Sequence, residues 1–224
     1  MLNKAGSTEN FLLSTIFLLL FGLLSFLVAA HIAIVSKIDN GTTTLLRPLI
    51  DPLTTKIIIT ISNLASPAIM TTYAIMITIC LASRTHLRSG LNFLLVFCLF
   101  NLINHLIKTI IERPRPHHKL VQISGFSFPS GHTFATVILV FLLLALVRKF
   151  HYSTRLYVCL AFCGWSLIFL IAFTRVFLHV HFLSDTIGSI LLASGSWQLM
   201  CGWVKLQNYR RIVHQENHRD NPLH

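Results

Sequence analysis

The chain has 224 residues, of which 54% are hydrophobic and only 11% charged, and its mean hydropathy is +0.71. This composition excludes an ordinary soluble domain, and several apolar runs reach the roughly 20 residues that a membrane-spanning helix needs. The formal charge of +11 would suggest nucleic acid in a soluble protein. Here the basic residues punctuate the apolar runs, as at an anionic membrane surface, and no basic stretch is interleaved with aromatic residues. We therefore expect an all-α, polytopic membrane protein, a single domain over residues 1–224, with no nucleic-acid partner.

The first elements combine one long apolar run with a mixed segment. Residues 11–35 predict a retained first span, because the apolar core of a signal peptide is normally shorter; a cleaved signal peptide ending at Val28-Ala29-Ala30 is the alternative. Residues 36–52, with Asn40-Gly41 and three threonines, predict a turn. Residues 45–64 carry charges among aliphatic side chains, which favours an interfacial amphipathic helix.

Five further spans are predicted, at residues 67–83, 91–111, 130–147, 156–177 and 182–204. Six spans place both termini on one side of the membrane. That side carries more of the lysines and arginines, more clearly so once Lys108, Arg115 and Arg175 are set aside for a ligand. The termini are therefore expected to be cytoplasmic, with a mobile polar tail over residues 205–224. All five cysteines fall inside apolar runs, and Cys159 and Cys163 are expected to be buried small residues.

Polar residues gather where the predicted spans end. Lys108 and Arg115 lie seven residues apart, but Pro114 and Pro116 forbid a continuous helix between them. We expect Lys108 to end the third span and Arg115 to return over it from a stiff loop, so that both cations face one anion. A basic loop that binds lipid headgroups is the alternative.

The sequence Pro129-Ser130-Gly131-His132 opens the fourth span. Proline fits the first turn of a helix. The Ser130 hydroxyl and the Gly131 N–H would then lie at the positive helix end, where anions bind, with His132 beside them. Taken alone, the pattern also fits a plain helix start with a stray histidine.

His181 and Asp185 are four residues apart, and therefore share one face at the start of the last span. A carboxylate on one imidazole nitrogen fixes the tautomer and leaves the other nitrogen as a nucleophile or base. Arg175 precedes them across a short turn, and His179 is expected to point elsewhere with a structural role. A zinc site made by His179, His181 and Asp185 is an alternative. Three nearby cations would oppose a dication, so we expect no metal.

Together these residues resemble the three-part signature of the type-2 phosphatidic acid phosphatase family, membrane lipid phosphatases related to vanadium haloperoxidases. The matching motifs are Lys108 with Arg115-Pro116, Pro129-Ser130-Gly131-His132, and Thr174-Arg175 with His181 and Asp185. They occur in order, each at its expected helix end, and the six-span layout covers nearly the whole chain. One departure is Thr174, where the family usually has Ser, and this keeps a hydroxyl.

The resemblance implies a haloperoxidase-like phosphatase core without metal or cofactor. His181 would attack phosphorus and form a phosphohistidine, Asp185 would orient it, and His132 would protonate the leaving alkoxide. The phosphate oxygens would be held by five groups: Lys108, Arg115, Ser130, the Gly131 N–H and Arg175. Water would then release phosphate from His181.

We therefore expect a metal-independent lipid phosphatase acting on a phosphate monoester or pyrophosphate in the bilayer. Phosphatidylglycerol phosphate, phosphatidic acid and undecaprenyl pyrophosphate all present the required group. The alternative is a non-catalytic lipid-phosphate-binding or transport protein that uses the same cationic pocket; a haloperoxidase-like use of vanadate is disfavoured because the pocket opens to lipid. Headgroup selectivity would come from the loops at 36–52 and 113–128. A bacterial cell membrane is expected, with the active site at the outer face, although Asn40-Gly41-Thr42 matches a glycosylation acceptor. The sequence carries no signal for an oligomeric state.

Overall fold

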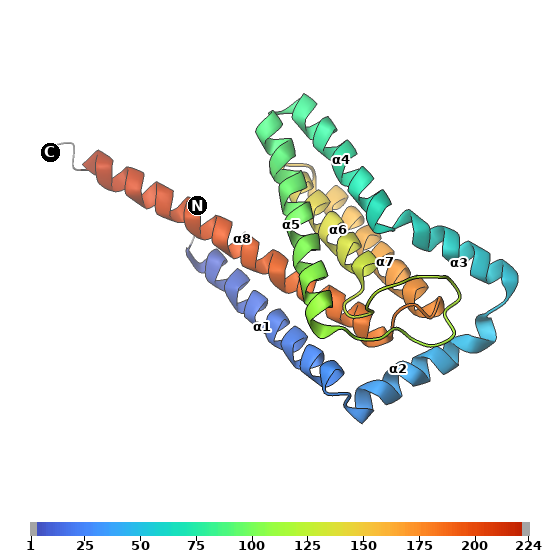
Figure 1. The fold of residues 1–224 in the computed structure, drawn as a ribbon. Helices are drawn as coiled ribbons and strands as arrows, with labels where there is room; N and C mark the ends of the chain where they lie inside the picture. Colours follow the sequence, from blue (N-terminus) through green and yellow to red (C-terminus); the bar gives the residue numbers. More distant parts are fainter. Residues whose placement is uncertain (1–3, 221–224) are drawn as a thin grey trace.

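The computed structural model describes residues 4–220, and this part of the chain is helical wherever it is regular. In chain order the elements are α1 (Lys4–Ala29), α2 (Ala33–Leu46), the 3-10 helix η1 (Arg47–Leu49), α3 (Pro52–Leu64), α4 (Pro67–Arg84), α5 (Leu87–Ile111), α6 (Gly131–Lys149), α7 (Thr154–Phe177) and α8 (Leu183–Asp220). Figure 1 shows α4 to α7 as a bundle, with α1 lying along α8 and with α2 and α3 crossing one end.

Six of the described helices are long and apolar enough to cross a membrane, which confirms the six-span prediction. They are α1 from Gly6, α4, α5, α6, α7, and α8 as far as Gln215. Helix α6 is the centre of the bundle, because it contacts α4, α5, α7 and α8. Its side chains Phe134, Val137 and Ile138 have no exposed surface. The first turn of α6, where the Ser-Gly-His sequence lies, is therefore surrounded by other helix ends.

Helix α1 packs antiparallel against α8 through small and polar residues. A Cβ atom on Gly195 would lie 2.8 Å from the Leu18 side chain, so the glycine permits a close approach of the two helices. The Ser14 hydroxyl donates a hydrogen bond of 2.9 Å to the Gly195 carbonyl. The Asn10 amide also donates to the Gln198 side chain. In lipid, where no water competes, such pairs help to fix which helices associate.

The segment after the first span differs from its prediction. The apolar run over residues 11–35 is divided at His31, which has φ of 52°, and a second helix begins at Ala33. The turn expected at 36–52 is wrong as far as Leu46, because α2 occupies it. Its three consecutive threonines each donate a hydroxyl hydrogen bond to the carbonyl four residues earlier, at 2.9–3.0 Å, and so remain compatible with the helix. The amphipathic helix expected at 45–64 begins only at Pro52, where the Asp51 carboxylate caps it by accepting from Leu53 N and Thr54 N.

The end of the chain and the cysteines differ as well. A mobile tail was predicted from residue 205, but α8 continues as a helix through Asp220; the last residues of that prediction, 221–224, lie outside the described part. Cys159 and Cys163 were expected to be buried, and both are exposed. Exposed apolar side chains are common on these helices because their outer faces are suited to lipid.

Candidate active site

Four helix ends meet at the same end of the bundle and carry the residues of the three motifs. Helix α5 ends at Glu112, which adopts a left-handed conformation (φ 51°) as the C-cap, and the prolines that follow prevent a further turn. Helix α6 starts directly after Pro129-Ser130. Helix α7 ends at Phe177, and α8 begins six residues later. Figure 1 shows the irregular connection between α5 and α6 lying over these ends.

Arg115 is fixed beside His181. Its Nη1 atom lies 3.3 Å from His181 Nε2 and donates at 2.7 Å to the Val180 carbonyl. Its other nitrogens donate to carbonyls of the α5–α6 connection, Nε to Gly125 at 2.9 Å and Nη2 to Ser124 at 3.2 Å. This guanidinium is therefore held by the backbone, next to the imidazole.

Lys108 is held by the same connection. Its ammonium donates at 3.1 Å to the Phe126 carbonyl. It lies in the last turn of α5, so a cation ends the third span as predicted. A carbonyl partner leaves its charge uncompensated, which suits a site for an anion.

His181 is 2% exposed and lies between a cation and a carboxylate. Its Nδ1 atom is 3.4 Å from Asp185 Oδ2, while Nε2 faces Arg115. Burial lowers the pKa of His181 well below its ordinary value near 6.5, and the charges of Lys108, Arg175 and Arg115 lower it further. The imidazole is therefore neutral near pH 7, the form in which a ring nitrogen can act as a nucleophile.

Arg175 is the third cation, and only 3% of it is exposed. Its Nη1 atom donates at 2.6 Å to the Ser62 hydroxyl of α3, while its Nε atom has no hydrogen-bond partner among the described residues. Thr174, the departure from the family pattern, is fully buried, and its hydroxyl donates at 2.7 Å to the Ile171 carbonyl. Thr174 therefore packs within α7, and Arg175 keeps a donor for a ligand.

The start of α6 is tied to α8. Ser130 N donates at 3.3 Å to the Asp185 carbonyl, and the Ser189 hydroxyl donates to the carbonyls of Ser130 and Asp185 at 2.9 and 2.8 Å. These bonds hold Ser130 and Gly131 at the helix N-terminus beside the third motif. His132 follows in the first turn, close enough to Arg175 and His181 for their charges to act on it.

The structure also places a buried acidic network behind Asp185, which the motif analysis missed. Arg113 donates from Nη1 to Asp185 Oδ1 at 2.6 Å and from Nη2 to Asp39 Oδ2 at 2.7 Å. Asp39 further accepts from Ser184 N at 2.9 Å and from Ser184 Oγ at 2.6 Å. The exposed fractions of the Arg113, Asp39 and Asp185 side chains are 10%, 1% and 0%. One arginine therefore holds the carboxylate that faces His181.

The sequence had assigned Arg113 to a connection that selects headgroups and Asp39 to a turn. One signal could have corrected this assignment. Asp39 follows Val35 by four residues, so both lie on one face once α2 is recognised as a helix, and both are buried. A buried carboxylate requires a cation, and the chain has only seven acidic residues.

Asn104 is a second residue to which the sequence analysis assigned no role. It lies on α5 one turn before Lys108, is 4% exposed, and its Oδ1 atom has no hydrogen-bond partner among the described residues. Its Nδ2 atom is 3.8 Å from the position that a Cβ on Gly131 would take. An incompletely bonded amide therefore faces the start of α6.

His179, for which the sequence predicted a structural role, lies between α7 and α8. It adopts φ of 52° in the α7–α8 turn, and its neighbours include Arg47 and His118. Burial lowers its pKa below the ordinary value. Among residues 6–215, whose side chains the structure describes, no three His, Cys, Asp or Glu residues are grouped so that they could hold a metal ion.

The chain is similar to known proteins in sequence and in fold. The family model described as PAP2 superfamily matches residues 89–209. Phosphatidylglycerophosphatase B of Bacillus subtilis (strain 168) is 33% identical over 125 residues, which cover 54% of this chain and 62% of that relative. The crystal structure of a transmembrane PAP2-type phosphatidylglycerolphosphate phosphatase from Bacillus subtilis superposes with a TM-score of 0.74 at 25% identity, over 89% of this chain and 96% of that one. The crystal structure of Aquifex aeolicus LpxE superposes with a TM-score of 0.54 at 19% identity, over 75% and 94% of the two chains, and shows the shared fold. The chain belongs to the PAP2 superfamily.

Proposed function

We propose that this chain is a lipid phosphatase that removes a terminal phosphate from a membrane lipid through a phosphohistidine on His181, within one domain. One observation carries the proposal: Nε2 of the buried His181 lies 3.3 Å from the Arg115 guanidinium, while Nδ1 faces the Asp185 carboxylate. A nucleophile, an anion-binding cation and an orienting carboxylate thus lie next to one another. The names of the relatives make phosphatidylglycerol phosphate the first substrate to test.

The first step follows from the positions of these groups. Nε2 of His181 attacks phosphorus, and the P–O bond to the lipid breaks as the P–N bond forms. Asp185 accepts the Nδ1 proton in a hydrogen bond and stabilises the charge that develops on the ring. His132 donates its proton to the leaving alkoxide, which departs as the lipid alcohol, or as the lipid monophosphate if the substrate is a pyrophosphate.

The second step returns the enzyme to its starting state. Water attacks the phosphohistidine, gives a proton to the neutral His132, and releases inorganic phosphate as the P–N bond breaks. During both steps the charge on the phosphate oxygens is stabilised by Lys108, Arg115 and Arg175 and by donors at the start of α6. Three fixed cations perform here the electrostatic role that divalent metals play in many other phosphoryl-transfer enzymes, so we propose that the reaction requires no metal.

The test is phosphate release from purified protein. Phosphatidylglycerol phosphate, phosphatidic acid and undecaprenyl pyrophosphate would each be supplied in detergent micelles, with and without EDTA. We expect release from at least one of them, no effect of EDTA, and no release by His181→Ala. The matched control is His179→Ala, which removes a buried histidine two residues away and should retain activity. Release by His181→Ala at the wild-type rate would refute the mechanism, and lipid binding without release by wild type would favour a binding or transport protein.

We propose further that both termini are cytoplasmic and that the site faces outward. The turns between α4 and α5 and between α6 and α7 lie at the opposite end of the bundle from the site and are rich in basic residues, which favours the cytoplasmic side. In a cysteine-free background, a membrane-impermeant maleimide should label Gln122→Cys in intact cells. It should label His86→Cys only after permeabilisation. The reverse pattern would invert the orientation.

A further inference from the structure

A cavity of about 820 Å³ lies at the end of the bundle opposite to the candidate active site. It is lined by the second half of α4, the second half of α6 and α7 as far as Leu167. On α6 the lining extends from Val140 to Leu146 and Val147, and Phe150 follows at the helix end. These ten residue steps correspond to about 15 Å along the helix axis, or half of the roughly 30 Å hydrocarbon core. The cavity therefore has the depth of one leaflet.

The walls of the cavity are apolar. Five of the lining residues are leucines from α6 and α7, among them Leu143, Leu144 and Leu160. Its inner end coincides with a close contact of α6 and α7, where a Cβ on Gly164 would lie 2.5 Å from Val140 Cγ1. The volume lies within the range of about 300–1,000 Å³ that is usual for sites of small molecules. Leu143 and Leu160 are each 39% exposed, so the cavity is accessible from the lipid side.

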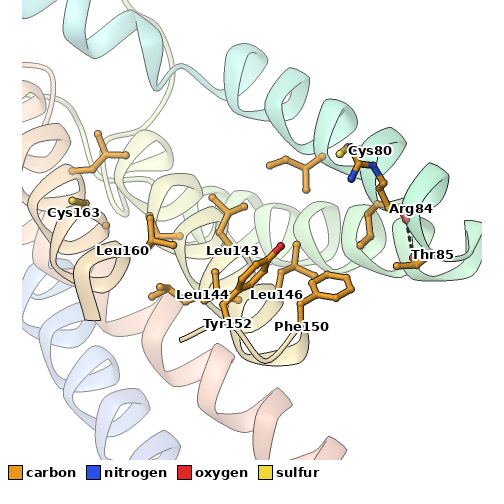
Figure 2. A pocket seen from close by; sticks show the side chains of 16 residues that line it. Cys80, Arg84, Thr85, Leu143, Leu144, Leu146, Phe150, Tyr152, Leu160 and Cys163 are labelled. Carbon is orange, nitrogen blue, oxygen red and sulfur yellow. Dashed lines mark hydrogen bonds between the residues drawn. The ribbon is translucent and has the colours of Figure 1, made fainter. Parts of the chain in front are cut away.

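The outer end of the cavity carries a cation and a hydroxyl. Figure 2 shows Arg84 and Thr85 at one end of the cavity, with Tyr152 and Phe150 along its side. Arg84 is exposed and makes no hydrogen bond or ion pair with any of residues 6–215, whose side chains the structure describes. The two turns at this end, residues 84–88 and 148–155, contain five Lys and Arg residues and no Asp or Glu. No acidic side chain among residues 6–215 forms an ion pair with them.

An apolar slot of one-leaflet depth, open to lipid and ending at an arginine that has no ion-pair partner among residues 6–215, matches one class of molecule. We propose that it binds an anionic phospholipid from the leaflet opposite to the candidate active site. An acyl chain would fill the space between α4, α6 and α7. The headgroup phosphate would lie against Arg84, with the Tyr152 hydroxyl as a further donor. Basic pockets between membrane helices recognise anionic headgroups in this way.

The experiment counts lipids that remain bound to the purified protein. Wild type in mild detergent receives equal amounts of phosphatidylglycerol and phosphatidylcholine with identical acyl chains, and the bound copies are counted by native mass spectrometry. We expect phosphatidylglycerol to be retained about fivefold more than phosphatidylcholine, a ratio typical of one basic contact. Equal retention of the two lipids would overturn the proposal, and this comparison needs no variant.

Variants locate the retained lipid. Arg84→Gln should remove the preference for phosphatidylglycerol, whereas Arg88→Gln, in the same turn but outside the cavity lining, should keep it. Leu143→Trp should fill the cavity and reduce the retention of both lipids. Its control is Leu156→Trp, at a similarly exposed position (41% against 39%) outside the lining, which should not. Monodisperse elution and an unchanged helical circular dichroism spectrum would establish that each variant is folded.

If the cavity held something other than this phospholipid, the same measurements would give different results. Loss of the retained lipid in Arg115→Gln, with no effect of Arg84→Gln, would assign it to the candidate active site and overturn the proposal. A dimer that Leu143→Trp dissociates, with no lipid retained by wild type, would assign the cavity to a second copy of the chain. If Arg84→Gln and Arg88→Gln reduced the preference for phosphatidylglycerol equally, the preference would reflect general surface charge, and the proposal would be overturned.

Discussion

Asp39 offers the most direct test of the network behind the candidate nucleophile. The substitution Asp39→Asn keeps the shape of the side chain and removes its charge. One oxygen remains to accept from Ser184 N, but an NH₂ group replaces the oxygen that accepts from Arg113 Nη2 at 2.7 Å and Ser184 Oγ at 2.6 Å. The serine hydroxyl can rotate to accept, whereas the guanidinium cannot. Arg113 therefore loses one of its two carboxylate partners in a place that is nearly closed to water.

The burial of the three side chains sets the size of the effect. Asp39 is 1% exposed, Arg113 10% and Asp185 0%, so solvent cannot replace the lost partner. Breaking a buried ion pair by removing one partner costs about 3–5 kcal/mol, and we expect the lower end, about 3 kcal/mol, because Arg113 keeps Asp185. For a chain of this size that corresponds to a fall of about 6–12 °C in the unfolding midpoint.

Activity should respond differently from substrate binding. Asp39 touches no atom of the proposed phosphate site but positions Arg113, which holds Asp185 against His181. We expect kcat to fall by about ten- to a hundredfold, because small displacements of orienting groups have effects of that size, and KM to stay within about twofold. A residue whose role was only structural would lower the amount of folded protein and leave the kcat of that fraction unchanged.

The assay compares unfolding midpoints in one detergent with kcat and KM on the folded, monodisperse fraction. Asp51→Asn is the matched control: it is the same chemical change at an exposed carboxylate that caps α3, and Asn caps helices as well as Asp does. Its midpoint and kcat should equal those of wild type. The reasoning would be refuted if Asp39→Asn also left both unchanged, or if Asp51→Asn lowered them equally.

Three further outcomes follow from the geometry. Burial lowers the pKa of His181 below 6.5. We therefore expect kcat/KM to stay level as the pH falls through 6.5 and to decline only below it, once each value is divided by the fraction of dianionic substrate measured by ³¹P NMR. A decline centred at or above pH 6.5 would contradict a neutral buried nucleophile. Asn104→Leu should lower kcat/KM and the affinity for inorganic phosphate by about 10- to 100-fold, since a hydrogen bond from the Asn104 Nδ2 donor to the anion would be lost. Asn101→Leu, which loses only an internal bond to a helix carbonyl, should leave both near wild type, and equal effects of the two would remove Asn104 from the site. Gly188→Ala should lower the unfolding midpoint by the equivalent of about 1–3 kcal/mol, because its Cβ would lie 2.6 Å from an aromatic ring of the α5–α6 connection. Gly22→Ala, with open space around it, should leave the midpoint unchanged. An unchanged midpoint in Gly188→Ala would show that this ring can move.

The membrane spans could be predicted from the sequence because the free energy of placing a helix in lipid is nearly a sum over its residues. A window of about 20 residues therefore locates α4, α6 and α7 to within a few positions. The same local reasoning failed at α2. There, a polar segment of threonines and Asn40-Gly41 is helical because Asp39 on its inner face reaches Ser184 and Arg113.

The candidate site, too, could be predicted from the sequence only in part. Lys108, Arg115, Ser130, Arg175, His181 and Asp185 could be named because helix ends and prolines restrict where each residue can lie, and because their spacing resembles a known family. The contacts of Arg115 with the carbonyls of Val180, Gly125 and Ser124 could not be named, since they depend on the path of an irregular connection.

Hydropathy and helix-end chemistry, both local properties of the sequence, determined that this is a six-span membrane protein with three polar clusters at one membrane face. Tertiary structure alone decided which buried charge compensates which. Asp39 and Ser184 are 145 positions apart and Arg113 and Asp185 are 72 apart, yet they form one hydrogen-bonded group. The physical reason is that the energy of a buried charge depends on its neighbours in space, and that neighbourhood exists only after the helices have packed.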